Sequence, residues 1–236
     1  MGRVIVITGA GQGLGHCITK LHLDRGDVIY ALDNNITGEL KTLAEKNSNL
    51  KIYQCDVSSG QEVNDSLRDV LGAGKRVDIL YNVAGIFSFS AAVPLAETDI
   101  DECIKMFNVN ALGAMRMCKA LFPLLQEGSV VLNVSSEAGS IGAARRTHTY
   151  GYCMSKAAMN MMGKILSNEL WAKKARVMMV YPGWMRTRMG GPASFESSRS
   201  VSPEESAEII VDYCLNINDI PRDQMFMSYT GYIIPW

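Results

Sequence analysis

Tyr152 and Lys156 stand four residues apart in the stretch TYGYCMSK, residues 149–156. On a helix, residues at this spacing lie on one face, so the lysine ammonium would stand beside the phenol and favour its ionised form. Such a phenol could serve as a general acid or base. An ordinary amphipathic pair on a helix surface is the alternative. Tyr150 lies six residues before Lys156, and we expect it at the helix entrance as a wall of a substrate pocket.

A glycine-rich segment, TGAGQGLG at residues 8–15, follows an apolar run and precedes a helical pattern. Glycines let a backbone turn sharply and approach a pyrophosphate, and the N–H groups of the following helix point at the phosphates. Asp33 ends the second apolar run 18 residues after Gly15, where an acidic side chain binds the ribose hydroxyls of adenosine. Asp56 follows the third run and would meet the adenine edge, or would be a turn or helix-cap residue. We predict a dinucleotide site here, with a tight turn that binds no ligand as the alternative.

Asp33 also bears on which dinucleotide binds. A 2′-phosphate would meet its carboxylate as a like charge, and its neighbours Leu32 and Asn34 offer no counter-charge. The turn itself carries Gln12 and His16, and neither is a strong base. We therefore predict NAD as the cofactor in preference to NADP.

Short β-branched runs alternate with longer amphipathic stretches along most of the chain. The candidate strands are Val4–Ile7, Val28–Leu32, Lys51–Cys55, Asp78–Asn82, Ser129–Val134 and Arg176–Tyr181. The candidate helices are 13–25, 37–46, 60–73, 99–126 (expected to be two helices) and 151–174. Several strands are apolar almost throughout, which is typical of strands covered on both faces. The alternation predicts an α/β fold with a single doubly wound (Rossmann) parallel sheet and helices on both faces.

The domain organisation is simple. No internal repeat or composition break divides the 236 residues, so we expect a single dinucleotide-binding domain over residues 1–236. Residues 187–206 are rich in Gly, Ser and Pro and are predicted to be a mobile substrate loop without regular structure. A final helix is expected to begin near Pro203.

The net charge and the positions of the cysteines limit which kinds of partner the protein is expected to bind. The formal net charge is −1 and the sequence pI about 6.3, which gives no electrostatic attraction to nucleic acid or to an anionic membrane. The six cysteines are scattered, and the three histidines show no metal-ligand spacing. We therefore expect no metal, no nucleic-acid partner and no membrane partner, and reduced thiols in the cytoplasm.

Taken together, these residues resemble the simple one-domain branch of the short-chain dehydrogenase/reductase superfamily. The matching segments are TGAGQGLG (8–15), NVAG (82–85), NVN (108–110), NVSS (133–136), YCMSK (152–156) and PGWMRT (182–187). PGWMRTRMGGP, SVSPEES and GYIIPW are also similar to the subgroup of C-factor-like and sniffer-like carbonyl reductases. Some members of that subgroup use NADPH, which conflicts with the prediction from Asp33.

The resemblance implies an oxidoreductase that interconverts a small or medium alcohol and its ketone or aldehyde by hydride transfer. Tyr152 would be the general acid/base. Its pKa must fall by roughly three units from about 10 to reach neutrality, which needs about 4 kcal/mol, and Lys156 and the positively charged nicotinamide would supply this. Ser136 would bind the substrate oxygen, with Ser135 as its competitor. Asn110 would hold a water that links Lys156 to solvent, or would only kink or cap a helix.

The predicted ligand contacts lie in the glycine turn, after the strands and in the PGWMRT segment. The cofactor contacts are Gly9, Gly11, Gln12, Gly13, Leu14, Gly15, Asp33, Asp56, Val57, Asn82, Ala84, Gly85, Tyr152, Lys156, Pro182, Gly183, Met185 and Thr187. The substrate contacts are Phe87, Ser88, Tyr150 and Met189. In the family, the helix at 151–174 often joins subunits, so a homodimer or homotetramer is expected; burial within one subunit is the alternative.

The connection between the serine and the tyrosine departs from the family pattern. Ser136 and Tyr152 are 16 residues apart, longer than the simple branch usually has, which leaves the placement of Ser136 open. Arg145, Arg146 and His148 in this connection would be solvated loop charges or would face an acidic substrate.

Two other functions use the same glycine turn. One is a non-catalytic dinucleotide-binding sensor or signalling protein on this fold. The other is a methyltransferase that binds S-adenosylmethionine, which would leave Ser136, Tyr152 and Lys156 unexplained. The full set of motifs predicts an NAD-dependent oxidoreductase.

Overall fold

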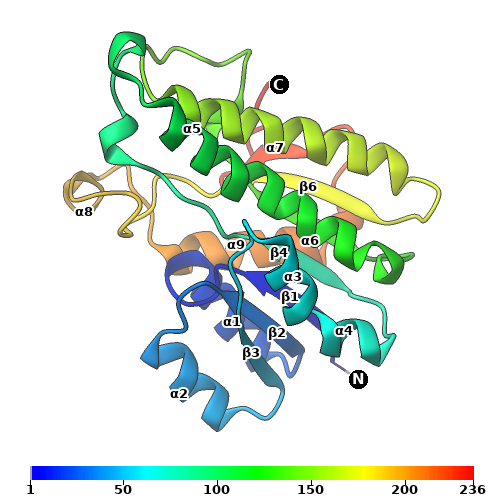
Figure 1. Ribbon diagram of the computed structural model, residues 1–236. Coiled ribbons are helices and arrows are strands. Elements are labelled where there is room, and N and C mark those ends of the chain that lie inside the picture. The colour runs from blue at the N-terminus through cyan, green and yellow to red at the C-terminus, as the bar shows by residue number, and fades with distance from the viewer. Residues whose placement is uncertain (1) are drawn as a thin grey trace.

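Within residues 2–236, which the computed structural model describes, seven parallel strands form one sheet in the order β3-β2-β1-β4-β5-β6-β7 (Figure 1). The strands are β1 (Val4–Thr8), β2 (Val28–Asp33), β3 (Leu50–Gln54), β4 (Ile79–Asn82), β5 (Val130–Val134), β6 (Arg176–Tyr181) and β7 (Phe226–Ser228). The order reverses between β1 and β4, and ligands of such sheets bind at this switch point, beyond the carboxyl ends of the strands.

Helices cover both faces of the sheet. They are α1 (Gly13–Asp24), α2 (Gly38–Lys46), α3 (Gly60–Ser66), α4 (Arg68–Ala73), α5 (Ile100–Phe107), α6 (Ala114–Leu121), α7 (Tyr150–Glu169), α8 (Ala193–Glu196) and α9 (Pro203–Leu215). Alternate strand residues point to opposite faces, so Ile5 and Ile7 of β1 pack with α1, α2 and α9. Val6, between them, packs in a second core with α3, α4, α6 and α7. α5 lies along α7 (Figure 1).

The predicted fold class is confirmed, and all six predicted strands are present to within one residue at each end. A seventh strand, β7, was not predicted and pairs in parallel with β6. β7 has three residues, Phe226–Ser228, and so short a run carries no alternating pattern. Its place in the sheet comes from long-range pairing alone.

Two helix predictions differ from the structure. The stretch 60–73 is not one helix but α3 and α4, which meet at Leu67. Ser66 Oγ donates to the Glu62 carbonyl at 2.7 Å, and serine back-bonding of this kind bends helices. α7 ends at Glu169 instead of 174, because the chain then turns and Lys174 adopts a positive φ of 55°.

The segment 187–206 contains regular structure, so the prediction of a stretch without it is wrong. α8 lies within it, and Met185 and Val201 form a parallel β-bridge. The Arg186 N–H donates to the Val201 carbonyl at 2.9 Å, which closes the excursion at its base. Its mobility stays a prediction. α9 begins at Pro203 as predicted, after a capping box.

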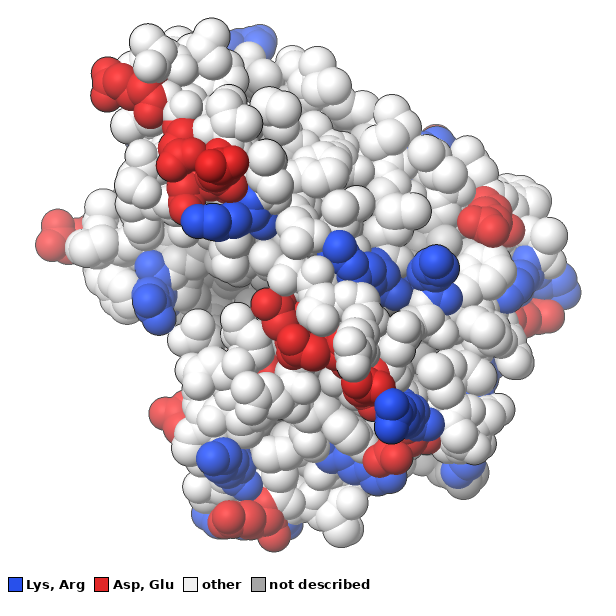
Figure 2. All heavy atoms as spheres, viewed as in Figure 1, with Lys and Arg blue, Asp and Glu red and all other residues white. Residues whose placement is uncertain are grey.

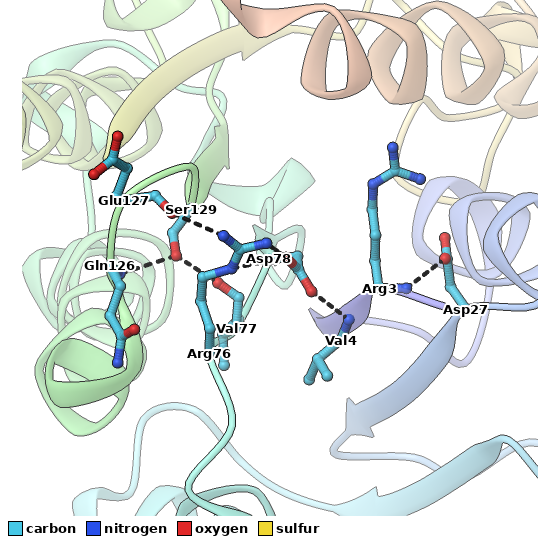
Figure 3. A network of polar contacts seen from close by, with 9 residues as sticks. All are labelled: Arg3, Val4, Asp27, Arg76, Val77, Asp78, Gln126, Glu127 and Ser129. Carbon is cyan, nitrogen blue, oxygen red and sulfur yellow. Dashed lines mark hydrogen bonds and ion pairs between the residues drawn. The ribbon is translucent and has the colours of Figure 1, made fainter. Parts of the chain in front are cut away.

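Polar contacts tie the amino ends of β1, β2 and β4 together (Figure 3). Asp27 Oδ1 accepts from the Arg3 N–H at 2.8 Å, and Asp78 Oδ2 accepts from the Val4 N–H at 2.7 Å. Arg76 pairs with the other oxygen of Asp78. Buried backbone donors at this edge are thereby satisfied. The opposite edge, at the carboxyl ends of the strands, is where the predicted site residues lie.

The surface carries charges of both signs. Acidic and basic side chains are interspersed on the face shown in Figure 2, in keeping with the net charge of −1. Among residues 2–236, no helix combines the length and the apolar character that a membrane crossing requires.

The close packing of the glycine turn can be tested by adding a methyl group and measuring the change in stability. A Cβ on Gly15 would lie 2.1 Å from the Gly9 carbonyl oxygen, so we expect Gly15→Ala to lower the free energy of unfolding by about 1–3 kcal/mol in urea denaturation. Gly38→Ala is the matched control, because a Cβ there meets nothing within 4 Å, and it should stabilise by about 0.4–1 kcal/mol. A Gly15→Ala variant as stable as the wild type would contradict this view of the turn.

Candidate active site

α7 brings Tyr152 and Lys156 to the carboxyl end of β5. Lys156 is 4% exposed, and its Nζ donates to the Val134 carbonyl at 2.8 Å. The same Nζ lies 5.7 Å from the centroid of the Tyr152 ring. A Cβ added to Gly85, beyond β4, would lie 3.6 Å from this Nζ, so the segment after β4 borders the same space.

The electrostatics of this pair differ from the sequence-based expectation. Burial lowers the pKa of Lys156 to about 8 and raises the pKa of Tyr152 to about 12, because desolvation disfavours the charged form of each. A hydrogen bond with Ser136 opposes the rise at Tyr152 but does not cancel it. In the protein alone, burial therefore favours the phenol, and the effect of the nicotinamide charge on Tyr152 stays a prediction. Desolvation is the largest effect on the pKa of Tyr152, and it favours the phenol form.

Ser135 and Ser136 point to different places. Ser135 Oγ donates to Asn160 Oδ1 at 2.6 Å inside the protein, where it is 2% exposed. Ser136 lies near enough to the Tyr152 hydroxyl for a hydrogen bond between the two side chains to lower the pKa of Tyr152. The structure thus brings Ser136, and not Ser135, to the tyrosine, and the long connection to α7 does not displace it.

Asn110 lies in a π-helical turn, Asn108–Gly113, between α5 and α6. Its Oδ1 accepts from the Ile86 N–H at 2.8 Å, and its Nδ2 donates to the Ile86 carbonyl at 3.0 Å and to Ser155 Oγ at 2.9 Å. The amide thus joins the turn to the segment after β4 and to the residue before Lys156. Both of its hydrogens are used within the protein.

The glycine turn and the end of β2 meet at Asp33. Asp33 Oδ2 accepts from the Gly11 N–H at 2.7 Å and Oδ1 from the Asn35 N–H at 2.9 Å. Each oxygen keeps a further lone pair. Thr37, which the sequence analysis passed over, donates to the Gly11 carbonyl at 2.8 Å and also caps α2. A Ser or Thr before a helical pattern signals a cap, but nothing local shows the bond to Gly11.

The PGWMRT segment, which is another predicted part of the cofactor site, also lies beside the glycine turn. Gly13 begins α1 with a φ of 54°, and a Cβ there would lie 3.5 Å from Thr187 Cγ2. Pro182 is held by Ser206 Oγ, which donates to its carbonyl at 2.7 Å. The structure therefore brings the first turn of α1 and the PGWMRT segment, far apart in sequence, to one place.

Other predicted cofactor contacts have structural partners. Asp56 Oδ1 accepts from the Ser58 N–H at 2.8 Å, which is the turn role left open in the sequence. Asn82 is 2% exposed and donates to Asn133 Oδ1 at 2.8 Å, so its side chain links β4 to β5 inside the core. The side chains of Leu14 and Val57 are likewise buried in the two cores. Only the backbones of these two residues are free to meet a ligand.

Of the predicted substrate residues, Phe87 lies against the tyrosine. Its ring meets that of Tyr152 edge-on, with centroids 5.1 Å apart and an angle of 88°. Ser88 shares a hydrogen bond of 2.8 Å with Ser90 at the surface. Tyr150 and Met189 are 36% and 43% exposed, so both have surface free for a ligand.

Two charged residues near Ser136 were not predicted as site residues. Ser136 Oγ donates to Glu137 Oε2 at 2.7 Å, and the other carboxylate oxygen pairs with Arg146 from the long connection. Beyond Glu137 lies a cavity of about 310 Å³, lined mainly by Tyr181 and the segment 228–235. No short-range spacing signals this arrangement, because the cavity wall is the carboxyl-terminal segment.

Comparison with known proteins identifies the family. Residues 3–196 match the short chain dehydrogenase family along their whole length. This chain is a short-chain dehydrogenase/reductase. The resemblance found in the sequence is thereby confirmed, and the protein is an oxidoreductase of this family with a nucleotide-binding Rossmann fold.

Individual relatives of this short-chain dehydrogenase/reductase agree. It is 32% identical over 162 residues to the C-signal protein of Myxococcus xanthus, covering 68% of this chain and 93% of that protein. The carbonyl reductase Sniffer of Drosophila melanogaster superposes with a TM-score of 0.88 at 26% identity, covering 100% of both chains. A short-chain dehydrogenase/reductase of Burkholderia multivorans with bound NADP gives a TM-score of 0.85 at 25% identity, again over 100% of both.

Proposed function

We propose that this enzyme interconverts a small or medium alcohol and its ketone or aldehyde by hydride transfer. The observation that carries the proposal is the placement of Ser136, Tyr152 and Lys156 together at the carboxyl edge of the sheet, which also holds the glycine turn. A bound nicotinamide would supply or accept the hydride, and the protein would orient the substrate and manage one proton.

In this proposal each side chain has one task. Tyr152 gives its proton to the substrate oxygen during reduction and takes it back during oxidation. Ser136 positions that oxygen. Lys156 exchanges protons near neutral pH because burial lowers its pKa to about 8. Asn110 acts by holding the π-turn against Ile86 and Ser155, since both hydrogens of its amide are already bonded.

A sensor or signalling protein on the same fold is the second candidate, and the similarity to the C-signal protein is the observation that favours it. A protein that only bound a dinucleotide would need Asp33 and the glycine turn. It would have no need of a desolvated lysine hydrogen-bonded beside a tyrosine and a serine. We therefore place the enzyme first.

We propose NAD as the preferred cofactor. The half-buried Asp33 carboxylate is fixed by two backbone N–H groups beside Gly11, where it can accept from ribose hydroxyls and would repel a 2′-phosphate. Its neighbours Asn34 and Asn35 carry no positive charge. A relative from Burkholderia multivorans binds NADP, and replacement of Asp33 discriminates between the two cofactors.

The substrate is proposed to enter between Phe87, Tyr150 and the segment 187–206. Phe87 and Tyr152 form an apolar wall beside the reacting oxygen, which suits a modest apolar ketone or alcohol. We also propose that residues 1–236 act as one domain, with 187–206 as the substrate loop. All six cysteines are free thiols, which suits the reducing environment of the cytoplasm.

We further propose a homodimer or homotetramer built on α5 and α7. Met154, Met161 and Ile165 of α7 follow a helical stripe and are 61%, 63% and 58% exposed, and Ile104 of the adjacent α5 is 59% exposed. Two adjacent helices that leave apolar side chains uncovered are typical of a subunit interface.

Replacing Tyr152 tests the enzyme proposal. Tyr152→Phe keeps the ring against Phe87 but removes the proton donor, so we expect kcat to fall by roughly 10²–10⁴-fold while the affinity for dinucleotide is unchanged. The measurement is nicotinamide absorbance at 340 nm over a panel of ketones, aldehydes and alcohols, with fluorescence titration of dinucleotide as the control. Turnover at the wild-type rate would remove Tyr152 from the mechanism.

Replacing Asp33 tests the cofactor preference. Asp33→Ala removes the negative charge that would repel a 2′-phosphate, so the NADP-to-NAD ratio of kcat/KM should rise by about tenfold or more, equivalent to about 1.4 kcal/mol. Asp33→Asn retains the shape of the side chain and should move the ratio in the same direction. An unchanged ratio in both variants would refute the assignment of Asp33.

Introducing charge into the exposed apolar stripe of α7 tests the proposed dimer or tetramer. We expect Met161→Glu/Ile165→Glu to change a dimer or tetramer into a smaller species in light scattering after size exclusion, because two carboxylates would be desolvated at the interface. Phe195→Glu, at a 61% exposed position on α8, is the control and should leave the mass unchanged. A wild-type protein that is already monomeric at micromolar concentration would contradict the proposal.

A further inference from the structure

The Ser136 hydroxyl donates its only hydrogen to Glu137. A carboxylate can only accept, so the 2.7 Å contact with Glu137 Oε2 uses the one hydrogen that Ser136 has. One of its two lone pairs accepts from the Ala138 N–H at 3.1 Å. A single lone pair is left to face Tyr152.

This arrangement determines which form of Tyr152 fits. While Ser136 points its hydrogen at Glu137, Tyr152 can bond to Ser136 only by donating its own proton, and it must therefore be a phenol. For Tyr152 to ionise with a hydrogen bond from Ser136, the serine must turn its hydrogen away from Glu137. The carboxylate and the phenolate compete for one proton.

The charges around Tyr152 also affect whether it is a phenol or a phenolate. The negative charge of Glu137 raises the pKa of Tyr152, and the positive charge of Arg146 lowers it. Arg146 pairs with Glu137, so the two opposing charges come from one exposed ion pair. The other titratable groups around Tyr152 are Lys156 and Cys153 on α7 and Tyr181 on β6. Tyr181 stays neutral because burial raises its own pKa.

We propose that Glu137 is a positioning residue that holds the Ser136 proton and keeps Tyr152 in its phenol form, with Arg146 as the counter-charge that limits this effect. The inference rests on the proposed role of Tyr152 as general acid/base. Reduction needs the phenol and should therefore persist to higher pH, while oxidation needs the phenolate and should begin at higher pH. In this proposal the connection 143–149 has a function, because it carries Arg146, which pairs with Glu137.

The two partners of the ion pair should have opposite effects. We would measure the pH dependence of kcat/KM for reduction of one ketone with NADH and for oxidation of its alcohol with NAD. In Glu137→Gln, the midpoints of both profiles should move to lower pH by roughly 0.5–1 unit, because the negative charge is lost and the amide oxygen that remains accepts the Ser136 hydrogen less strongly than a carboxylate does. In Arg146→Gln, both should move to higher pH. Arg145→Gln removes a neighbouring exposed charge that is bonded only to the Ala144 carbonyl and should leave the midpoints in place.

The outcomes separate this inference from the proposed function. If Glu137→Gln and Arg146→Gln both lower kcat and leave the midpoints unchanged, or move them in the same direction, the ion pair only holds the loop and the inference is refuted. If Tyr152→Phe keeps its turnover, the proposed function fails instead. Opposite shifts from the two variants cannot arise from a loosened loop, since both variants break the same contact.

Discussion

A buried lysine amine fixes the geometry of the site. The bond from Lys156 Nζ to the Val134 carbonyl, 2.8 Å long, ties α7 to the last residue of β5. Because Tyr152 lies one helical turn before Lys156, the same bond holds the phenol over the end of the strand, beside Ser136. Desolvation lowers the pKa of the Lys156 amine to about 8 and raises the pKa of the Tyr152 phenol to about 12, so the phenol stays protonated. The chemistry proposed for this enzyme depends on these two groups being buried together.

Around this contact the fold supplies what each group needs. The close approach of Gly139 to the backbone of Lys156 packs the turn after Ser136 directly on α7, since a Cβ there would lie 2.7 Å from the Lys156 carbonyl carbon. The π-helical turn that carries Asn110 bonds to Ser155, which also lies on α7. Two independent elements therefore hold the helix in register with the strand.

The sequence predicts the parts of this structure that have a local signal. Several strands are apolar almost throughout, and short β-branched runs alternate with amphipathic stretches, so all six longer strands and the fold class could be predicted. The glycine turn and the Tyr152–Lys156 spacing stand out as motifs. Features made by distant residues could not be predicted. The three-residue β7, the bond from Thr37 to Gly11 and the pairing of Glu137 with Arg146 each depend on segments that meet only after folding. The effect of burial on the pKa of Tyr152 could not be predicted for the same reason, because desolvation is a property of the whole site.

The central claim is that hydride passes between a nicotinamide and a carbonyl carbon held at Ser136 and Tyr152. The most direct measurement is reduction of a ketone substrate in two separate reactions, with NADH deuterated on one face of C4 and with NADH deuterated on the other, followed by mass spectrometry and NMR of the product. The proposed mechanism predicts one deuterium on the carbinol carbon, transferred from one face of the nicotinamide, while the hydroxyl proton comes from solvent. Deuterium that is lost to water, or a product without label from both labelled cofactors, would contradict it.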